Sequence, residues 1–150
     1  MKQNFNELIT QGDEAKVINY TLHAIISFDK LQTRLLHPIV VTDAVDTYKE
    51  LSAIRDYEGH RILTIHISKV AKCNPGDSYN KELGKRIAQS RAYIRYYHIM
   101  NMIFKNTINY YKKLGLQPID DNCWLAKTAA EFHLKYNNEC IHLNEMLKDL

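Results

Sequence analysis

Residues 61–77 read RILTIHISKVAKCNPGD, and this stretch decides the fold because it joins two differently patterned halves of the chain. Up to Cys73, apolar and polar residues alternate, which is typical of a half-buried β-strand. Residues 74–77 then break the strand, because proline cannot continue a ladder of backbone hydrogen bonds and glycine permits a positive φ. Asp77 is a natural helix N-cap. The sequence therefore predicts a change from sheet to helix at this point.

The same alternation marks another expected strand at residues 17–28. Its apolar residues share one face, and its content of β-branched and aromatic residues favours a strand. The spacing of the apolar residues between 17 and 31 also fits a helix, which stays the alternative. Residues 35–41 form a third expected strand, in which Pro38 indicates a sheet edge or a bulge.

Two helices are expected in the same half of the chain. Residues 5–9 carry apolar side chains at i, i+3, i+4 spacing before Gly12, which is typical of a short helix with a glycine stop. Thr42 or Asp43 is expected to cap a second helix that runs to about Tyr57.

The C-terminal half predicts two long helices. The first runs from Asp77 to about Leu114, just before Gly115, and its apolar residues lie on two sides, so it is expected to be buried on more than one side. The second follows Pro118, and the acids at 120–121 complement its N-terminal dipole. Its apolar residues repeat at nearly heptad spacing and require a partner, either the preceding helix in an antiparallel hairpin or a helix of another protomer.

Together these patterns predict an α+β fold with an antiparallel β-sheet in the N-terminal half, followed by a long C-terminal two-helix hairpin. Residues 1–150 are expected to form a single domain, because this length suffices for one substantial core. A composition of 45% hydrophobic and 25% charged residues is ordinary for a folded domain.

The sequence indicates an intracellular protein. No apolar run reaches the roughly 18 residues that cross a bilayer, and the first residues, MKQNFN, lack the apolar region of a signal peptide. The three cysteines form no C-x-x-C pair, and an odd number cannot all pair within one chain. Reduced thiols fit the cytoplasm, so we expect a cytoplasmic protein without membrane contact.

The sequence contains no recognisable pattern of catalytic residues. Its seven histidines are scattered without zinc-site spacing, and it lacks the G-x-S-x-G, P-loop and Rossmann glycine patterns. Cys73 lies near Lys72 and an expected helix start, which favours a reactive thiolate, but a buried cysteine at a strand end is the simpler interpretation. We therefore expect no enzyme, no metal ion and no cofactor.

Charge is distributed unevenly along the chain. The net charge is only +3, yet residues 69–113 hold ten basic and two acidic residues, a net charge of +8. A local excess of this kind concentrates phosphates and other anions. The alternative is that the basic segment pairs with the acidic remainder of the protomer or of an oligomer.

A candidate anion-binding site is expected where the strand gives way to the long helix. Backbone N–H groups at a helix start favour anions, arginine offers two parallel donors to a phosphate, and a tyrosine can stack on a base. Gly84 inside the helix costs about 1 kcal/mol relative to alanine, which indicates close approach of a backbone or a ligand. The expected ligand-binding residues are Lys72, Tyr79, Asn80, Arg86, Arg91 and Arg95. The alternative interpretation is that Tyr79 packs in the core and the basic residues are solvated.

Residues 70–92 resemble a segment that recurs in small phage and prophage proteins. Residues 70–80 read VAKCNPGDSYN, and Gly84, Ile87-Ala88 and Arg91-Ala92 follow. The family pattern is roughly A-x-C-x-P-x-D-x-(aromatic)-(D/N)-x-x-x-G-x-x-(I/L)-A-x-x-R-A. The resemblance covers about 23 of the 150 residues and departs at Gly76, where many members carry Glu. It implies a phage origin, and therefore the cytoplasm of the host cell.

The order of sheet and helices, together with size and origin, is also similar to that of the phage anti-Thoeris sponge proteins. That family sequesters cyclic ADP-ribose-type signals, and sometimes cyclic oligonucleotides, at oligomer interfaces without cleaving them. None of its ligand residues can be matched onto this chain. The resemblance implies an anti-defence protein that captures an anionic small molecule, a cyclic nucleotide or an ADP-ribose derivative, as a homo-oligomer formed through the C-terminal helices. Lys72, Arg86, Arg91 and Arg95 would hold phosphates, and Tyr79 would stack on a base.

Two other functions stay open from the sequence. One is a nucleic-acid-binding accessory protein that uses the helix face between Arg91 and Lys112 as a track for the phosphate backbone, with an affinity that falls steeply with salt. The other is a protein–protein inhibitor of a host defence system, comparable to an anti-CRISPR factor.

Overall fold

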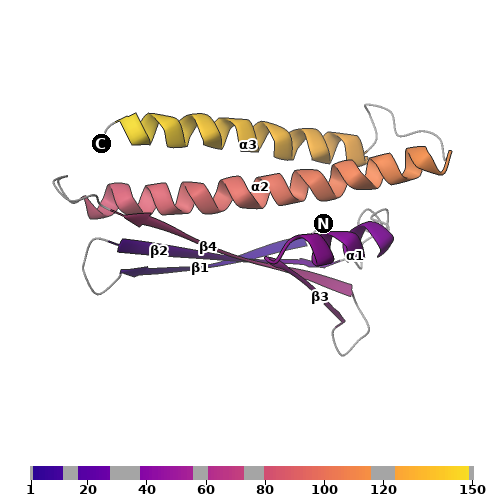
Figure 1. Cartoon of the computed structure of the whole chain (residues 1–150), viewed down its shortest axis with the longest axis horizontal. Coiled ribbons are helices and arrows are strands. Elements are labelled where there is room, and N and C mark those ends of the chain that lie inside the picture. The colour runs from indigo at the N-terminus through magenta and orange to yellow at the C-terminus, as the bar shows by residue number, and fades with distance from the viewer. Residues whose placement is uncertain are drawn as a thin grey trace.

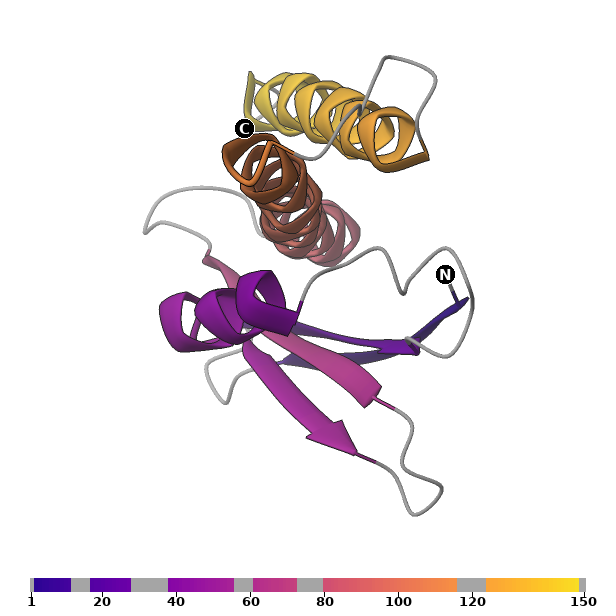
Figure 2. The same cartoon turned by 90° about the vertical axis from the view of Figure 1, so that its right-hand side faces the viewer.

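The computed structural model describes residues 2–11, 17–27, 38–55, 61–72, 80–115 and 124–148. They form four strands, β1 (Lys2–Gln11), β2 (Val17–Ser27), β3 (Leu51–Arg55) and β4 (Arg61–Lys72), and three helices, α1 (Pro38–Thr47), α2 (Lys81–Lys113) and α3 (Trp124–Lys148). The sheet, α2 and α3 are stacked in that order, and the short α1 lies on the helix side of the sheet (Figures 1 and 2). The expected α+β fold, an antiparallel sheet followed by a two-helix hairpin, is confirmed.

The four strands are all antiparallel and follow the order β1-β2-β4-β3. β2 pairs with β4 along its whole length, with Val17 opposite Lys72 and Ser27 opposite Ile62. β3 is shorter and pairs only with the first part of β4, from Arg61 to Ile65. The second part of β4 therefore lies at an edge of the described sheet.

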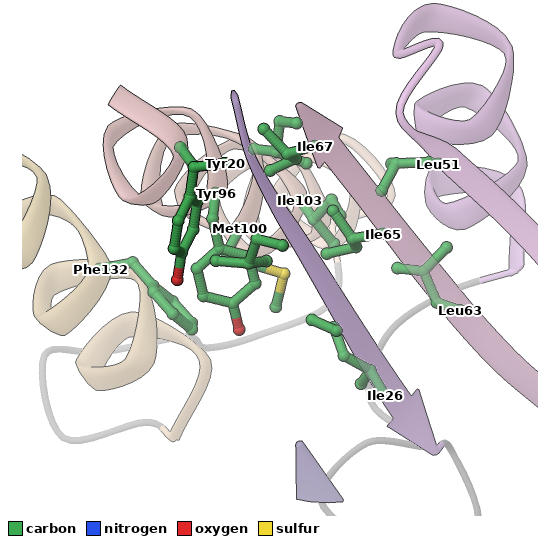
Figure 3. Close-up of a cluster of buried hydrophobic side chains, with 14 of the residues drawn as sticks. Tyr20, Ile26, Leu51, Leu63, Ile65, Ile67, Tyr96, Met100, Ile103 and Phe132 are labelled. Carbon is green, nitrogen blue, oxygen red and sulfur yellow. The ribbon is translucent and has the colours of Figure 1, made fainter. Parts of the chain in front are cut away.

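The strands β2 and β4 each bury one face against α2. The buried residues are Ile18, Tyr20, Leu22, Ala24 and Ile26 of β2 and Leu63, Ile65, Ile67 and Ala71 of β4. Figure 3 shows Tyr20 beside Tyr96 and Met100 of α2, with Phe132 of α3 at the end of the same cluster. Each large apolar side chain buried in this way contributes about 1.5–3 kcal/mol. The strand interpretation of residues 17–27 is thus confirmed over the helical alternative, while Phe28 lies outside the described residues.

The long helix α2 is buried on two sides, as its sequence predicts. Ala88 and Ala92 are fully buried toward the sheet side of the core, and Phe104 is fully buried near α3, where it contacts Trp124 with ring centroids 5.3 Å apart. At its end, Leu114 is the C-cap and Gly115 adopts a positive φ of 71°, as expected for a residue just past a helix. The N-cap is Asn80 rather than the expected Asp77. Asn80 is extended, and its side chain accepts a hydrogen bond of 3.1 Å from the Leu83 N–H.

Gly84 has a packing role in α2. A Cβ atom at this position would lie 2.9 Å from Cδ1 of Ile18, a buried residue of β2. The absence of a side chain therefore allows the first turns of α2 to approach the sheet closely. The neighbour that this glycine admits is the side chain of a strand residue and not another backbone.

The last helix α3 packs antiparallel along α2, which confirms the expected hairpin (Figure 1). Of its nearly heptad repeat, Leu125, Ala129 and Phe132 are buried. Further along, Tyr136, Cys140 and Leu143 are half-buried. Leu147 is 36% exposed, whereas the adjacent Met146 is buried in the core. The acids at 120–121 and Leu150 lie outside the described residues.

Three expectations for the N-terminal half are wrong. Residues 5–9 belong to β1 and not to a helix, because β1 pairs with β2 over its whole length, and such pairing outweighs a short local pattern. Residues 38–41 begin α1 instead of ending a strand, since proline fits the first turn of a helix; residues 35–37 lie outside the described part. The helix expected to reach Tyr57 ends at Thr47, and residues 51–55 form β3.

None of the helices in the described part of the chain combines the length and the apolar character that a membrane span needs.

Candidate functional site

A cleft opens where the edge of β4 meets the two long helices. Its volume is about 380 Å³, within the range of small-molecule sites. We call it the basic cleft. It is lined by Lys69 of β4, by Arg91, Ile94, Arg95 and His98 of α2, and by Tyr136 and Leu143 of α3.

Helix and strand periodicity bring these side chains together. Arg91, Arg95 and His98 stand at i, i+4 and i+7, so they lie on the same face of α2. Lys69 alternates in step with the buried Ile67 and Ala71, and therefore lies on the helix side of β4. The cleft thus combines an ammonium from the sheet with two guanidinium groups from the helix.

Arg95 is held in place by a carboxylate. Its Nε donates to Oε2 of Glu50 at 2.5 Å, and the side chains of Arg95 and Glu50 are 33% and 9% exposed. The Arg95 guanidinium also lies 5.4 Å from the centre of the Tyr48 ring. The hydrogen bond from Arg95 lowers the pKa of the Glu50 carboxyl, and the same bond raises the pKa of Arg95. One positive charge of the cleft is therefore neutralised and fixed.

Arg91 keeps its charge without a carboxylate partner in the described part of the chain. Its Nη1 donates to the backbone oxygen of Val70 at 2.7 Å, which ties α2 to the edge of β4. A guanidinium carries five N–H donors, so this bond leaves donors for another acceptor. Lys69 likewise forms no ion pair with a described carboxylate. Arg91 and Lys69 are the two charges that an incoming anion could neutralise.

Two aromatic rings, one from α2 and one from α3, also line the cleft. The rings of His98 and Tyr136 lie with their centroids 5.9 Å apart. Tyr48 also contacts His98, with centroids 6.5 Å apart. A planar group that entered beside the cations would find a ring surface for stacking.

A second hollow of about 280 Å³ continues along the same edge of β4. It is lined by Lys49, Glu50, His66, Ile67, Ser68 and Lys69. Lys69 borders both spaces, which are otherwise lined by different residues. Among the described residues that line the two spaces, Glu50 is the one acid, and it already pairs with Arg95.

The structure brings together only part of the site expected from the sequence. Arg91 and Arg95 line the basic cleft, whereas Lys72 and Arg86 are exposed and do not line it. Asn80 is exposed, and its side-chain oxygen caps α2. Tyr79 lies outside the described residues, so its role as a stacking residue stays a prediction.

Five residues of the cleft were not among the expected ligand-binding residues, namely Lys69, Ile94, His98, Tyr136 and Leu143. Ile94 and His98 lie on α2, the helix that also carries the expected arginines. Lys69 shares the alternation of Ile67 and Ala71, and this pattern could have placed it on the helix side of β4. Tyr136 and Leu143 fall on the apolar repeat of α3, where helix packing accounts for them. No signal in the sequence indicates that this repeat meets the arginine face of α2 at an open cleft.

Comparison with known proteins assigns no family: no protein-family model matches the chain, and neither a curated protein nor a solved structure matches it significantly. Among the described residues, no group of three or more His, Cys, Asp or Glu side chains could hold a metal ion. The function is therefore argued from the chemistry of the basic cleft.

Proposed function

We propose that the protein is a binding protein without catalytic activity that holds a small anionic ligand of the nucleotide class in the basic cleft. The observation that carries the proposal is the presence of Lys69 and Arg91 side by side in a cleft without a carboxylate partner in the described chain. Two half-buried cations that line one cleft give it a positive field that favours an anion. A phosphate satisfies both, because arginine can bind it through two parallel donors and lysine as a point charge.

The remaining lining supports a ligand that is more than a phosphate. The rings of Tyr136 and His98 stand beside the cations, and Ile94 and Leu143 supply apolar surface. A nucleotide has this combination of an anionic and a planar part. The size of about 380 Å³ favours a small molecule over a polynucleotide track.

In its finer form, the proposal is that the ligand is a cyclic-nucleotide or ADP-ribose-type immune signal, captured intact by a phage-encoded anti-defence protein. This part rests on the sequence resemblance, and the cleft is compatible with it. Catalysis is not part of the proposal, because the described lining of the cleft provides cations, rings and apolar groups but no nucleophile paired with a base.

Isothermal titration calorimetry with a panel of cyclic nucleotides and ADP-ribose derivatives tests the proposal. We expect Lys69→Ala and Arg91→Ala each to weaken binding at least tenfold, since each removes a charge-assisted hydrogen bond worth about 1.5–3 kcal/mol. Lys72→Ala on the same strand and Arg86→Ala on the same helix are matched controls, because both residues are exposed outside the cleft. These controls are expected to bind as the unaltered protein does.

The controls also separate the competing functions. If Lys72→Ala and Arg86→Ala weaken binding while the cleft variants do not, the ligand lies at the start of α2 and the cleft proposal fails. A gradual loss over many basic residues, with a steep dependence on salt, would instead indicate a nucleic-acid track. Failure of the whole panel to bind would leave a protein–protein inhibitor as the better account.

We further propose that the protein forms a homo-oligomer through its C-terminal helices. Leu134 and Ile141 support this, because they are 60% and 57% exposed and stand seven residues apart on one face of α3. Leu134→Glu and Ile141→Glu are expected to lower the mass measured by light scattering to that of one chain. Lys135→Glu, at an exposed neighbouring position, is the control. A single-chain mass for the unaltered protein would contradict the proposal.

A further inference from the structure

A pair of histidines lies on the outer face of the sheet, because both are exposed and alternate with residues that are buried on the helix side. The helices α2 and α3 cover the opposite face of the sheet (Figures 1 and 2). His23 of β2 and His66 of β4 are directly opposite in the register of the two strands. The backbone N–H of His66 points away from β2, because it donates to the oxygen of Glu50 at 2.9 Å. His23 and His66 are therefore a non-hydrogen-bonded pair, in which opposed side chains approach most closely.

The two imidazole rings are turned toward each other through their nitrogens. Nδ1 of His66 lies 2.5 Å from Nε2 of His23, and the ring centroids are 4.2 Å apart with planes at 76°. Two neutral imidazoles present either a donor or a lone pair at each nitrogen. One ring therefore presents its N–H to the lone pair of the other, and the two nitrogens form a hydrogen bond.

The neighbouring residues hold this geometry. Two residues further along the same face, Oγ1 of Thr21 and Oγ of Ser68 are hydrogen-bonded at 3.1 Å. The backbone at His23 is paired on both sides, with β1 and with β4. At His66, β4 pairs with β2 on one side, and the His66 N–H bonds the Glu50 oxygen on the other. The side chains of His23 and His66 are nevertheless exposed, and an ion can reach them from solvent.

We propose that His23 and His66 together chelate one divalent transition-metal ion of the Zn²⁺, Ni²⁺ and Cu²⁺ group. Imidazole is a preferred ligand of these ions. Tetrahedral coordination with Zn–N bonds of about 2.0–2.1 Å places two nitrogens about 3.3 Å apart. Small rotations of two exposed rings provide the necessary separation. The proposal does not depend on the basic cleft or on its ligand.

The site is open. Within the described residues no third His, Cys, Asp or Glu joins the pair, so the remaining coordination positions belong to water or to an exchangeable ligand. Open sites of this kind accept an added ligand, whereas closed four-ligand sites are structural. We therefore expect reversible binding that is not required for folding, with Cu²⁺ bound more tightly than Ni²⁺ or Zn²⁺.

Titration of the chelator-treated full chain with Zn²⁺ and with Cu²⁺, followed by calorimetry, tests the proposal. One ion per chain is expected, and His23→Gln and His66→Gln are each expected to weaken binding at least tenfold, because each leaves a single imidazole. His133→Gln is the control, since His133 is an exposed histidine of α3 far from the sheet pair and contacts Asn137. The control is expected to bind as the unaltered protein does.

An independent readout is the electron paramagnetic resonance spectrum of the Cu²⁺-loaded protein, which reports the nitrogen ligands. Two equivalent imidazole nitrogens are expected in the unaltered protein, and one or none in either variant. The proposal is overturned if the unaltered protein binds no ion, or if the two variants keep its affinity. It is also overturned if the spectrum of the unaltered protein shows fewer than two nitrogens.

Discussion

At the scale of single residues, Glu50 shapes the basic cleft more than its sequence position suggests. It directly precedes β3, and its side chain is only 9% exposed, yet it keeps its negative charge because Arg95 donates to it. Because the charge of Arg95 is paired with Glu50, Arg95 is a fixed part of the cleft wall. An anion that enters the cleft would therefore be bound mainly by Lys69 and Arg91.

Replacement of Glu50 by glutamine should lower the free energy of unfolding at pH 7 by about 1–2 kcal/mol, between the values of exposed and buried ion pairs, because Arg95 is one-third exposed. The pKa of folded Glu50 lies below its ordinary value of 4.5. Its contribution to stability is therefore complete above about pH 4.5 and is lost as the pH falls through the lower, folded pKa.

Urea unfolding of the protein and of Glu50→Gln at a series of pH values measures this contribution. The difference in free energy of unfolding between the two proteins is expected to be constant near neutral pH and to disappear in acid. A gap that stays the same down to the lowest pH, or that widens in acid, would show that the pair does not contribute in this way.

At the scale of elements, the contact between α2 and β2 depends on Gly84. Alanine at this position gains about 1 kcal/mol of helix propensity, but its Cβ would lie 2.9 Å from Cδ1 of Ile18. Cδ1 is the flexible end of that side chain, so the two effects should nearly cancel in Gly84→Ala. A larger residue cannot be accommodated in this way, and Gly84→Leu should destabilise by about 2 kcal/mol or more.

A double-mutant cycle isolates the contact. Ile18→Val removes Cδ1, so Gly84→Ala should be more favourable by about 1 kcal/mol in the Ile18→Val background than in the unaltered protein. Chemical denaturation of the four proteins gives the coupling energy. A coupling of zero would mean that α2 does not rest on Ile18 at this position.

The elements that the sequence predicts correctly are those with long and uniform patterns. The alternation around Tyr20 and Ile65 and the two-sided apolar pattern around Ile99 each persist over many residues, and the structure buries them accordingly. β1 was missed because a few apolar residues at helical spacing say nothing about the strand that lies opposite. Pro38 was misread because the same residue fits a sheet edge and the first turn of a helix.

The candidate site is predicted only where it lies on one element. Arg91 and Arg95 share a helix face, so their meeting follows from periodicity. Tyr136 joins them from α3 and Lys69 from β4, and this depends on how far α3 and β4 lie from that face after folding. No local pattern encodes such a distance. For the same reason, the direct opposition of His23 and His66 follows from the strand register and not from their separation in sequence.

At the scale of the whole molecule, the three-layer arrangement leaves surfaces of different chemistry. The edge of β4 and the hairpin enclose the basic cleft, the outer sheet face carries the histidine pair, and the outer side of α3 exposes Leu134 and Ile141. Because α2 separates the outer sheet face from α3 (Figure 2), a partner on α3 need not disturb the histidines. The basic cleft includes Tyr136 and Leu143 of α3. A partner that binds α3 is therefore expected to alter ligand binding in the cleft.

The central claim is that the basic cleft holds a small anionic ligand of the nucleotide class and does not cleave it. Native mass spectrometry of the purified protein, before and after mixing with cyclic nucleotides and ADP-ribose derivatives, tests it most directly. We predict a discrete species that gains an integral number of ligands of unchanged mass, and a loss of this gain in Arg91→Ala but not in Arg86→Ala. A discrete species that gains no ligand from the whole panel, or that releases a ligand of altered mass, would contradict the claim.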